Sequence, residues 1–320
     1  MLRDGGNAID AAIAALSMAC VCEPVLCSPG GGGFAMLRSG TTKAIGLLDF
    51  FPHTPLTARR DGQVRVEEIL ADFGTATQAF HIGAGTTATP GFFPGLEAMH
   101  RAGASMVLAD LVAPAAKAAR DGVVITDFQH HLATVVRPIL TATADAAALF
   151  APEGEVLEAG HRFTNPGLAD ALELLAARGF TDSEVADRLL DLQRDGGHLT
   201  RSDLDGYEVV ARSPLELRVG DTMVFMNPLP AASGILIAHS LEAATSADPV
   251  AMAVAFDATD RARRAAAGDL TALSAEALRQ RGTTHVSVID ADGNACAVTT
   301  SNGSGNGELV APFGFMPNNI

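Results

Sequence analysis

The sequence predicts an α+β fold, because helical and strand patterns both recur along a chain of globular composition. Hydrophobic residues make up 48% of the 320 residues and charged residues 18%, which is enough apolar material to bury a large core. The section from about Gly91 to Gly206 is mainly helical by its apolar spacing, whereas the segments on both sides of it favour strands. One large domain or two ordinary ones fit this length.

The first predicted helix runs from Ala8 to Val21, where the residues are small and apolar almost all round, and Asn7 can cap its start. A glycine loop, Gly30 to Gly33, comes next. Two short strands, Phe34–Leu37 and Ala44–Leu48, then surround a turn. The chain is therefore expected to open with a buried helix, a glycine loop and a hairpin.

Further elements follow from spacing alone. Apolar residues three and four apart predict helices over 95–102, 108–120, 166–178 and 183–193. After them we expect strand character over 207–226, a loop over 227–234 and a helix over 235–244. The Ala- and Arg-rich segment over 261–280 is expected to be a linker that is either helical or poorly ordered.

Charge and composition exclude several function classes. The formal net charge is -15, which opposes binding to nucleic acid and to anionic membrane surfaces and favours a small-molecule or peptide partner. Charged or polar residues interrupt the longest apolar run, so no membrane span is expected. Four cysteines without a paired C-x2-C spacing predict neither a disulfide scaffold nor a metal site, and no cofactor is expected. The absence of a convincing signal peptide leans towards the cytoplasm and leaves the compartment open.

A second hairpin is predicted near the end of the chain. Alternating residues make Thr284–Asp290 a strand, and Ala295–Thr300 forms its return strand. If the three residues Ala291–Gly293 close the hairpin, counting back places Thr283 opposite Ser301. A loop of four residues would instead move Ser301 opposite Thr284.

Thr283 directly follows Gly282 at the open end of this hairpin. If the bond between them were cut, Thr283 would carry a hydroxyl and a free α-amine, which titrates at roughly 7.7 to 8.0 and can take the hydroxyl proton. Threonine at a strand end more often serves β propensity and local hydrogen bonding. The hairpin by itself leaves both interpretations open.

Several short motifs, in a fixed order along the chain, favour a catalytic role for Thr283. They are Gly5–Ala12, Gly30–Phe34 followed by Asp49-Phe50, Thr89–Gly91, Ala113–Ala115, Gly196-Gly197 with Asp203-Leu204 and Tyr207, and Thr283–Asn294. Together they resemble the γ-glutamyltransferase family of N-terminal nucleophile hydrolases over nearly the whole chain.

That resemblance implies a four-layer αββα sandwich with a helical middle section, incomplete at the C-terminus in this chain. It implies a precursor that cleaves itself before Thr283, so that residues 1–282 resemble the large subunit and residues 283–320 the start of the small catalytic subunit. The two processed subunits would associate as a heterodimer. The substrate would be a small-molecule or peptide γ-glutamyl or related acyl amide.

The resemblance also implies roles for single residues. Thr283 would attack the carbonyl of Gly282 during cleavage and later take an acyl group from substrate, with Ser301 as the second hydroxyl of the site. The substrate-binding positions that it suggests are Thr299, Asn302, Gly303 and His53. The glycine pair that forms the family's oxyanion hole is expected beyond the hairpin.

Two departures from the family pattern matter. The family has an arginine after its Asp-Phe pair that accepts the substrate α-carboxylate, but Phe51 stands here. Either His53 or Arg38 compensates, or both have ordinary surface or strand roles. Gly303 stands where the family often has asparagine, with Asn302 one step away. Acyl transfer is thus better supported than γ-glutamyl specificity.

Three alternatives remain at this point. An inactive fragment or non-catalytic relative would keep the fold pattern without turnover. A related amidase or acylase would use the same threonine on other acyl groups. A nucleotide-binding loop at Gly30–Gly33 is disfavoured, because phosphate loops follow a strand and open a helix, whereas this loop follows a predicted helix and opens a strand.

Overall fold

The computed structural model describes residues 1–60, 62–74, 76–265 and 283–320, which form two compact units. The first unit comprises Met1–Ala44, Leu48–Val210 and the described part of Arg281–Ile320. The second comprises Ile45–Leu47 and the described part of Ala211–Gln280. Helices and strands both occur in each unit, so the fold is α+β as predicted.

Most of the helices belong to the first unit. They are η1 (Leu2–Asp4), α1 (Ala8–Cys22), η2 (Ala84–Thr86), α2 (Phe92–Gly103), α3 (Leu108–Asp121), α4 (Asp127–Val135), α5 (Arg137–Leu140), α6 (Ala144–Phe150), α7 (Pro166–Arg178), α8 (Glu184–Gln193) and α9 (Arg201–Asp205). The second unit contributes α10 (Ala232–Ala243) and α11 (Pro249–Ala265).

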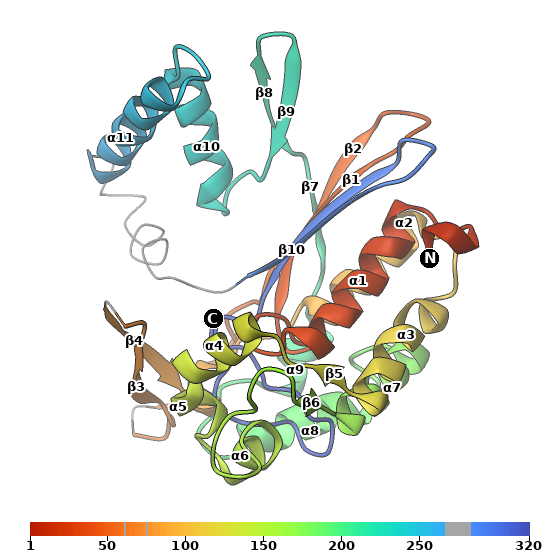
Figure 1. Ribbon diagram of the computed structural model, residues 1–320, viewed down its shortest axis with the longest axis vertical. Coiled ribbons are helices and arrows are strands. Elements are labelled where there is room, and N and C mark those ends of the chain that lie inside the picture. The colour runs from red at the N-terminus through yellow and green to blue at the C-terminus, as the bar shows by residue number, and fades with distance from the viewer. Residues whose placement is uncertain (61, 75, 266–282) are drawn as a thin grey trace. The chain divides into compact units, whose positions relative to one another are not determined.

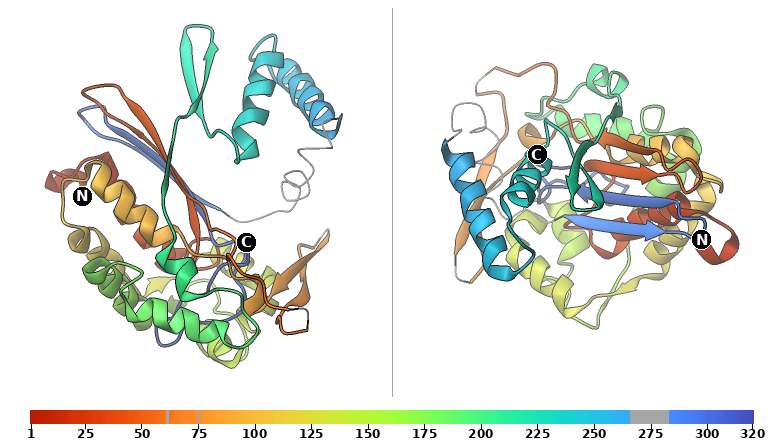
Figure 2. Two further views of the ribbon diagram at one scale, coloured as in Figure 1. Left: turned by 180° about the vertical axis from the view of Figure 1, so that it is seen from behind. Right: turned by 90° about the horizontal axis from the view of Figure 1, so that it is seen from above.

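The main sheet has five strands in the order β10-β11-β1-β2-β7, with bounds Thr284–Ile289, Ala295–Ser301, Gly32–Arg38, Ile45–Phe50 and Val210–Arg212. Small two-stranded sheets are formed by β3 (Glu67–Asp72) with β4 (Thr77–Ile82), by β5 (Val123–Val124) with β6 (Arg162–Phe163), and by β8 (Leu215–Val219) with β9 (Thr222–Met226). Seen from above, the blue C-terminal hairpin lies beside the red and orange N-terminal strands (Figure 2).

The core of the first unit lies between this sheet and the helices on one of its faces. Helix α1 packs on β10 and β11, α2 packs on β1, and α3 and α7 follow outside α1 (Figure 1). Gly95 of α2 lies so close to Phe50 that an added Cβ would come within 2.4 Å of the ring. A glycine is therefore required where α2 crosses the end of β2.

Helix α1 begins where its sequence predicts, at a capping box. The Asn7 side chain accepts hydrogen bonds from the backbone N–H groups of Ile9 (2.9 Å) and Asp10 (3.1 Å), and Asp10 accepts one from Asn7 N–H (2.7 Å). The buried Asp10 carboxylate also accepts hydrogen bonds from the N–H groups of Ser105 and Met106, each at 3.0 Å. One carboxylate thus joins the start of α1 to the segment before α3.

The predicted helices over 95–102, 108–120, 166–178 and 183–193 are present as parts of α2, α3, α7 and α8. The apolar spacing does not indicate the hairpin β3-β4 or the helices α4 to α6. The predicted loop over 227–234 is wrong at its end, because α10 already begins at Ala232. A Cβ on Gly234 would meet the carbonyl oxygen of Asn227 at 1.9 Å, so this glycine permits a close helix approach and does not mark a loop. Of the predicted linker, residues 261–265 belong to α11 and the rest lies outside the described residues.

Replacing Asp10 with alanine is expected to lower the free energy of unfolding by about 2 kcal/mol or more, because it removes a capping interaction and unpairs buried N–H groups. Burial raises the pKa of Asp10, but hydrogen bonds from Ser105, Asn7 and Met106 outweigh it, so the pKa is lowered overall. The contribution of Asp10 is therefore complete above about pH 4 and is lost as the pH falls through the folded-state pKa.

Guanidinium unfolding of the wild type and the variant at pH 7 and pH 3 measures both effects. The difference between the two proteins should shrink at pH 3. Asp4→Ala is the matched control, because Asp4 is exposed and pairs only with the nearby N-terminal amine in the described structure. Equal stability losses for the two variants would contradict this account of Asp10.

Candidate active site

The hairpin β10-β11 has the predicted register. Asp290 N–H donates to the carbonyl of Asn294 (3.0 Å), so the three residues Ala291–Gly293 form the loop. Thr284 pairs with Thr300, and the same register carried one residue back sets Thr283 beside Ser301. The alternative register, with Ser301 opposite Thr284, is therefore wrong.

The side chain of Asp290 holds this turn in place. Its carboxylate accepts hydrogen bonds from the backbone of Asp292 (3.0 Å) and Asn294 (2.9 Å), and from the Asn294 side chain (2.8 Å). It also accepts one from Ala8 N–H at the start of α1 (3.0 Å). Burial raises the pKa of Asp290, but these hydrogen bonds outweigh it and the net shift is downward. The D-x-D-G-N segment thus closes the hairpin and fastens it to α1.

Thr283 and Thr284 differ in their surroundings although they are neighbours. Thr284 is buried, and its hydroxyl donates to the Glu23 carboxylate at the end of α1 (2.7 Å). Its cross-strand partner Thr300 lies with its hydroxyl 3.5 Å from the Cys27 sulfur. Thr283 is exposed. Because strand side chains alternate between faces, Thr284 anchors the strand and Thr283 stands on the opposite face.

Rows of residues across three strands define that opposite face. Ser301 pairs with Gly32 of β1, and the β10 register continued by one residue adds Thr283 to this first row. A Cβ on Gly32 would come within 2.4 Å of the Phe50 carbonyl oxygen, so this end of the row has no room for a side chain. The Ser301 hydroxyl oxygen accepts a hydrogen bond from Gly303 N–H (3.0 Å).

The second row on this face consists of His285, Thr299 and Phe34. One ring nitrogen of His285 lies 2.8 Å from the Thr299 hydroxyl and the other 2.8 Å from the Ser287 hydroxyl. The predicted substrate-binding residue Thr299 is therefore on the same face as Thr283 and Ser301. Its hydroxyl, however, is already paired with His285.

The other predicted substrate-binding residues have different environments. Asn302 is fully buried, and its side-chain amide donates to the Met316 carbonyl (3.2 Å). Gly303 has a φ of 64° and forms the turn that follows Ser301. The ring of His53 lies against Tyr207, with centroids 4.7 Å apart, while its backbone pairs with Thr89. Gly282 lies outside the described residues.

Asn318 is a structural residue that the motifs did not assign to the site. Its fully buried side chain accepts a hydrogen bond from Ala88 N–H (3.0 Å) and donates to the carbonyls of Ala88 (3.0 Å) and Gly30 (2.6 Å). It therefore holds the glycine loop against the segment that follows the hairpin. The only sequence signal for it is a pair of adjacent asparagines after an apolar stretch.

Backbone groups of the glycine loop form hydrogen bonds with other groups of the protein. It follows α1 and opens β1, and the Gly31 carbonyl accepts hydrogen bonds from the N–H groups of Gly91 and Phe92, each at 2.9 Å, at the start of α2. This order is the reverse of a phosphate-binding loop. No cluster of three or more His, Cys, Asp or Glu side chains suited to a metal ion occurs within the described ranges, and no helix described is long and apolar enough to cross a membrane.

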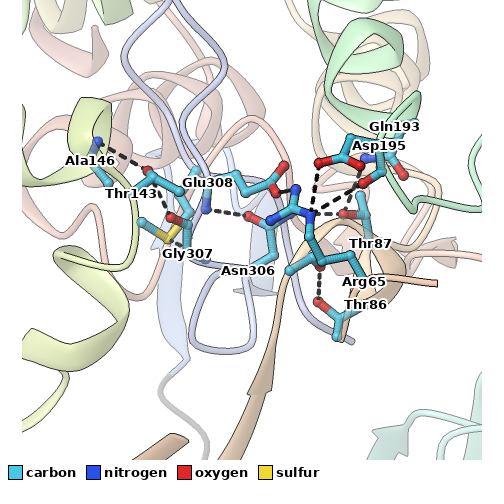
Figure 3. Close-up of polar contacts among 12 residues, drawn as sticks. Arg65, Thr86, Thr87, Thr143, Ala146, Gln193, Asp195, Asn306, Gly307 and Glu308 are labelled. Carbon is cyan, nitrogen blue, oxygen red and sulfur yellow. Dashed lines mark hydrogen bonds and ion pairs between the residues drawn. The ribbon is translucent and has the colours of Figure 1, made fainter. Parts of the chain in front are cut away.

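A polar cluster joins the segment after Ser301 to residues from earlier in the chain (Figure 3). Arg65 forms an ion pair with Glu308, whose side chain is only 5% exposed. On its other side the guanidinium lies 3.4 Å from the Asp195 carboxylate. Asn306 donates to the Thr87 hydroxyl (2.9 Å) and accepts from Glu308 N–H (3.0 Å). Apart from the ion pair, the Glu308 carboxylate has no hydrogen-bond partner in the described part of the chain.

Arg65→Met is expected to lower the free energy of unfolding by about 2 kcal/mol, because it leaves the buried Glu308 carboxylate without its cation. This figure is discounted because the Arg65 side chain is 43% exposed. The double variant Arg65→Met with Glu308→Leu should regain most of the loss, since no buried charge remains. Chemical denaturation of the three proteins measures the coupling.

Arg137→Met provides the control, because Arg137 is also 43% exposed but pairs with Glu155, which is 80% exposed. Its loss should cost no more than about 1 kcal/mol. Equal costs for the two arginines, or no recovery in the double variant, would contradict the role given to Glu308.

Comparison with known proteins links this geometry to one family. A family model described as Gamma-glutamyltranspeptidase matches residues 1–254. The glutathione hydrolase proenzyme of Escherichia coli (strain K12) is 29% identical over 377 aligned residues, which cover 100% of this chain and 63% of that protein. The Acylase ACY 1 proenzyme of Pseudomonas sp. (strain V22) is 30% identical over 247 residues, which cover 75% of this chain and 44% of that protein. The chain thus spans less than two thirds of either relative.

Solved structures agree with this relationship. The gamma-glutamyltranspeptidase from Pseudomonas nitroreducens complexed with L-DON matches with a TM-score of 0.64 and 26% identity, over 75% of this chain and 70% of that one. The cephalosporin acylase from Bacillus halodurans matches with a TM-score of 0.77 and 22% identity, over 99% of this chain and 66% of that one. The α+β fold of the chain therefore matches these structures over part of their length.

Proposed function

We propose, because the chain belongs to the gamma-glutamyltranspeptidase family, that it is an acyltransferase or amidohydrolase that works through Thr283. The observation that supports the proposal is that Thr283 is exposed at the open end of a hairpin whose register, continued by one residue, pairs it with Ser301. We also propose that the complete protein has the four-layer αββα sandwich, of which the main sheet with α1 and α2 on one face would form half.

The first step in the proposal is cleavage between Gly282 and Thr283. The Thr283 hydroxyl oxygen adds to the Gly282 carbonyl, an ester C–O bond forms, and the C–N bond breaks to release the α-amine of Thr283. Water then hydrolyses the ester, which leaves a carboxylate on Gly282 and restores the hydroxyl. Residues 1–282 and 283–320 would belong to two subunits of a heterodimer.

The second step uses the amine that the first step creates. The α-amine takes the hydroxyl proton, the hydroxyl oxygen attacks the acyl carbon of an amide substrate, and the substrate amine leaves with a proton. Transfer of the acyl group to water or to a second amine frees Thr283. In this scheme Ser301 donates a hydrogen bond towards Thr283, and its own oxygen is oriented by Gly303 N–H.

Contacts across the proposed cleavage point support association of the two pieces. The ladder between β1 and β11, the hydrogen bonds of Asn318 and the ion pair of Arg65 with Glu308 all join residues before 282 to residues after 283. Buried groups take part in all three. Cleavage would therefore leave the pieces bound to each other.

A second candidate is an acylase that uses the same threonine without γ-glutamyl specificity. The specific observation in its favour is Phe51, which occupies the place of the family's carboxylate-binding arginine. The Acylase ACY 1 proenzyme among the relatives shows that the family includes proteins named for this type of activity.

The intact mass of the purified complete gene product tests the first step. The wild type should give two polypeptides, one of which begins at Thr283, while Thr283→Ala should remain a single chain. Thr284→Val should still be cut at the same bond, because the hydroxyl of Thr284 is committed to Glu23.

This experiment separates two adjacent threonines of the same strand. If the wild-type chain remains uncut, like Thr283→Ala, the self-cleavage proposal is contradicted and a non-catalytic relative is favoured. If cleavage depends on Thr284 and not on Thr283, the assignment of Thr283 as the nucleophile is contradicted.

A further inference from the structure

Two phenylalanine rings lie beside the row that contains Thr283. Phe34 and Phe51 are stacked, with ring centroids 5.7 Å apart and an interplanar angle of 21°. Phe34 is half-buried, and 37% of Phe51 is exposed. An exposed stacked pair of aromatic rings can take a further flat apolar group on its edge or face.

Strand geometry places this pair close to the candidate nucleophile. Phe34 stands two residues along β1 from Gly32, the last member of the Thr283 row, and it points to the same face. With neighbouring strands about 4.8 Å apart and about 3.4 Å per residue, the Cα atoms of Thr283 and Phe34 are roughly 12 Å apart. The side chains of both residues extend into the space above that face.

The backbone of Phe51 is held on both sides. Its N–H donates to the buried Asp49 carboxylate (3.0 Å), and its carbonyl accepts from the Tyr207 hydroxyl (2.9 Å). The next pairing along this segment is between His53 and Thr89. The ring of Phe51 is therefore presented from a fixed backbone, which lowers the entropy lost when a ligand packs on it.

Three arginines of the described residues have partners within the protein. Arg38 donates to the Gly293 carbonyl (2.6 Å). Arg59 donates to the carbonyls of Gln193 and Gly197, and Arg65 pairs with Glu308. The Phe51 ring itself offers no cation to a carboxylate, whereas its apolar face suits an apolar group.

We propose that Phe34 and Phe51 form an acyl-binding platform that selects an apolar acyl group, with an aromatic end and no α-carboxylate. This inference rests on the proposed function, because the platform acts on the acyl group carried by Thr283. The reaction is hydrolysis of an arylacetyl amide: water adds across the amide, and an arylacetic acid and a free amine leave.

The test uses the complete protein and two anilides, phenylacetyl anilide and γ-glutamyl anilide. Wild type should hydrolyse the phenylacetyl compound with the higher kcat/KM. Phe51→Leu should lower that kcat/KM by about 10-fold, because it removes the ring but keeps an apolar side chain. Phe51→Arg should lower it further and raise kcat/KM for γ-glutamyl anilide by about 10-fold or more, through a new carboxylate contact.

Phe128→Leu is the matched control, because Phe128 is an exposed phenylalanine of α4, which packs on α5. It should leave both kcat/KM values unchanged. Retention of chain cleavage by each variant shows that it has folded. In a separate binding measurement, phenylacetate and L-glutamate are compared by ligand-observed NMR with wild type and Phe51→Leu.

The outcomes separate the inference from the function on which it rests. A preference for γ-glutamyl anilide, or equal effects of Phe51→Leu and Phe128→Leu, overturns the platform and leaves the acyl-transfer proposal standing. Phenylacetate binding that depends on Phe51, in a protein that neither cleaves itself nor hydrolyses either anilide, supports the platform and overturns the proposed function. Absence of binding, cleavage and hydrolysis overturns both.

Discussion

The antiparallel ladder between β1 and β11 is the interaction on which the rest of the first unit depends. It pairs Gly32–Arg38, near the start of the chain, with Ala295–Ser301, near its end. One face of the ladder packs on α1 and α2 through buried residues such as Ala35 and Val298. The other face carries the candidate site. Pairing these two strands closes a long loop, and the entropy cost of loop closure grows only with the logarithm of the loop length. Burial of the apolar face of the ladder offsets this cost.

The pairing of β10 with the same strand β11 sets which of two adjacent threonines is exposed. Side chains on a strand alternate, so a shift of one residue in register would bury Thr283 and expose Thr284. The Asp290 carboxylate opposes such a shift, because it binds both the turn and the first turn of α1. A structural carboxylate at one end of the hairpin thus helps to set which hydroxyl is exposed at the other end.

Local signals in the sequence were sufficient for α1 and for the hairpin, but they left two registers of the hairpin open. The Asn7 cap and the Asp290–Asn294 turn are short-range features, and they can be recognised without knowing what surrounds them. The ion pair of Arg65 with Glu308 and the stacking of Phe34 on Phe51 join residues of different segments. No periodic pattern in the sequence predicts either contact. His53 was predicted as a substrate ligand because it lies close to Phe51, which stands where the family has its arginine, and its contact with the Tyr207 ring could not be predicted from that spacing.

The ladder has one more consequence if the chain is cut before Thr283. Its two strands then belong to different polypeptides, although they paired while they were still parts of one chain. Reassembly after unfolding would be a bimolecular encounter between fragments, without the effective concentration that a covalent connection provides. The cleaved protein would retain a fold that forms readily only in the uncleaved precursor. Its lifetime would then be set by the rate at which the sheet unfolds, and not by the equilibrium free energy of refolding.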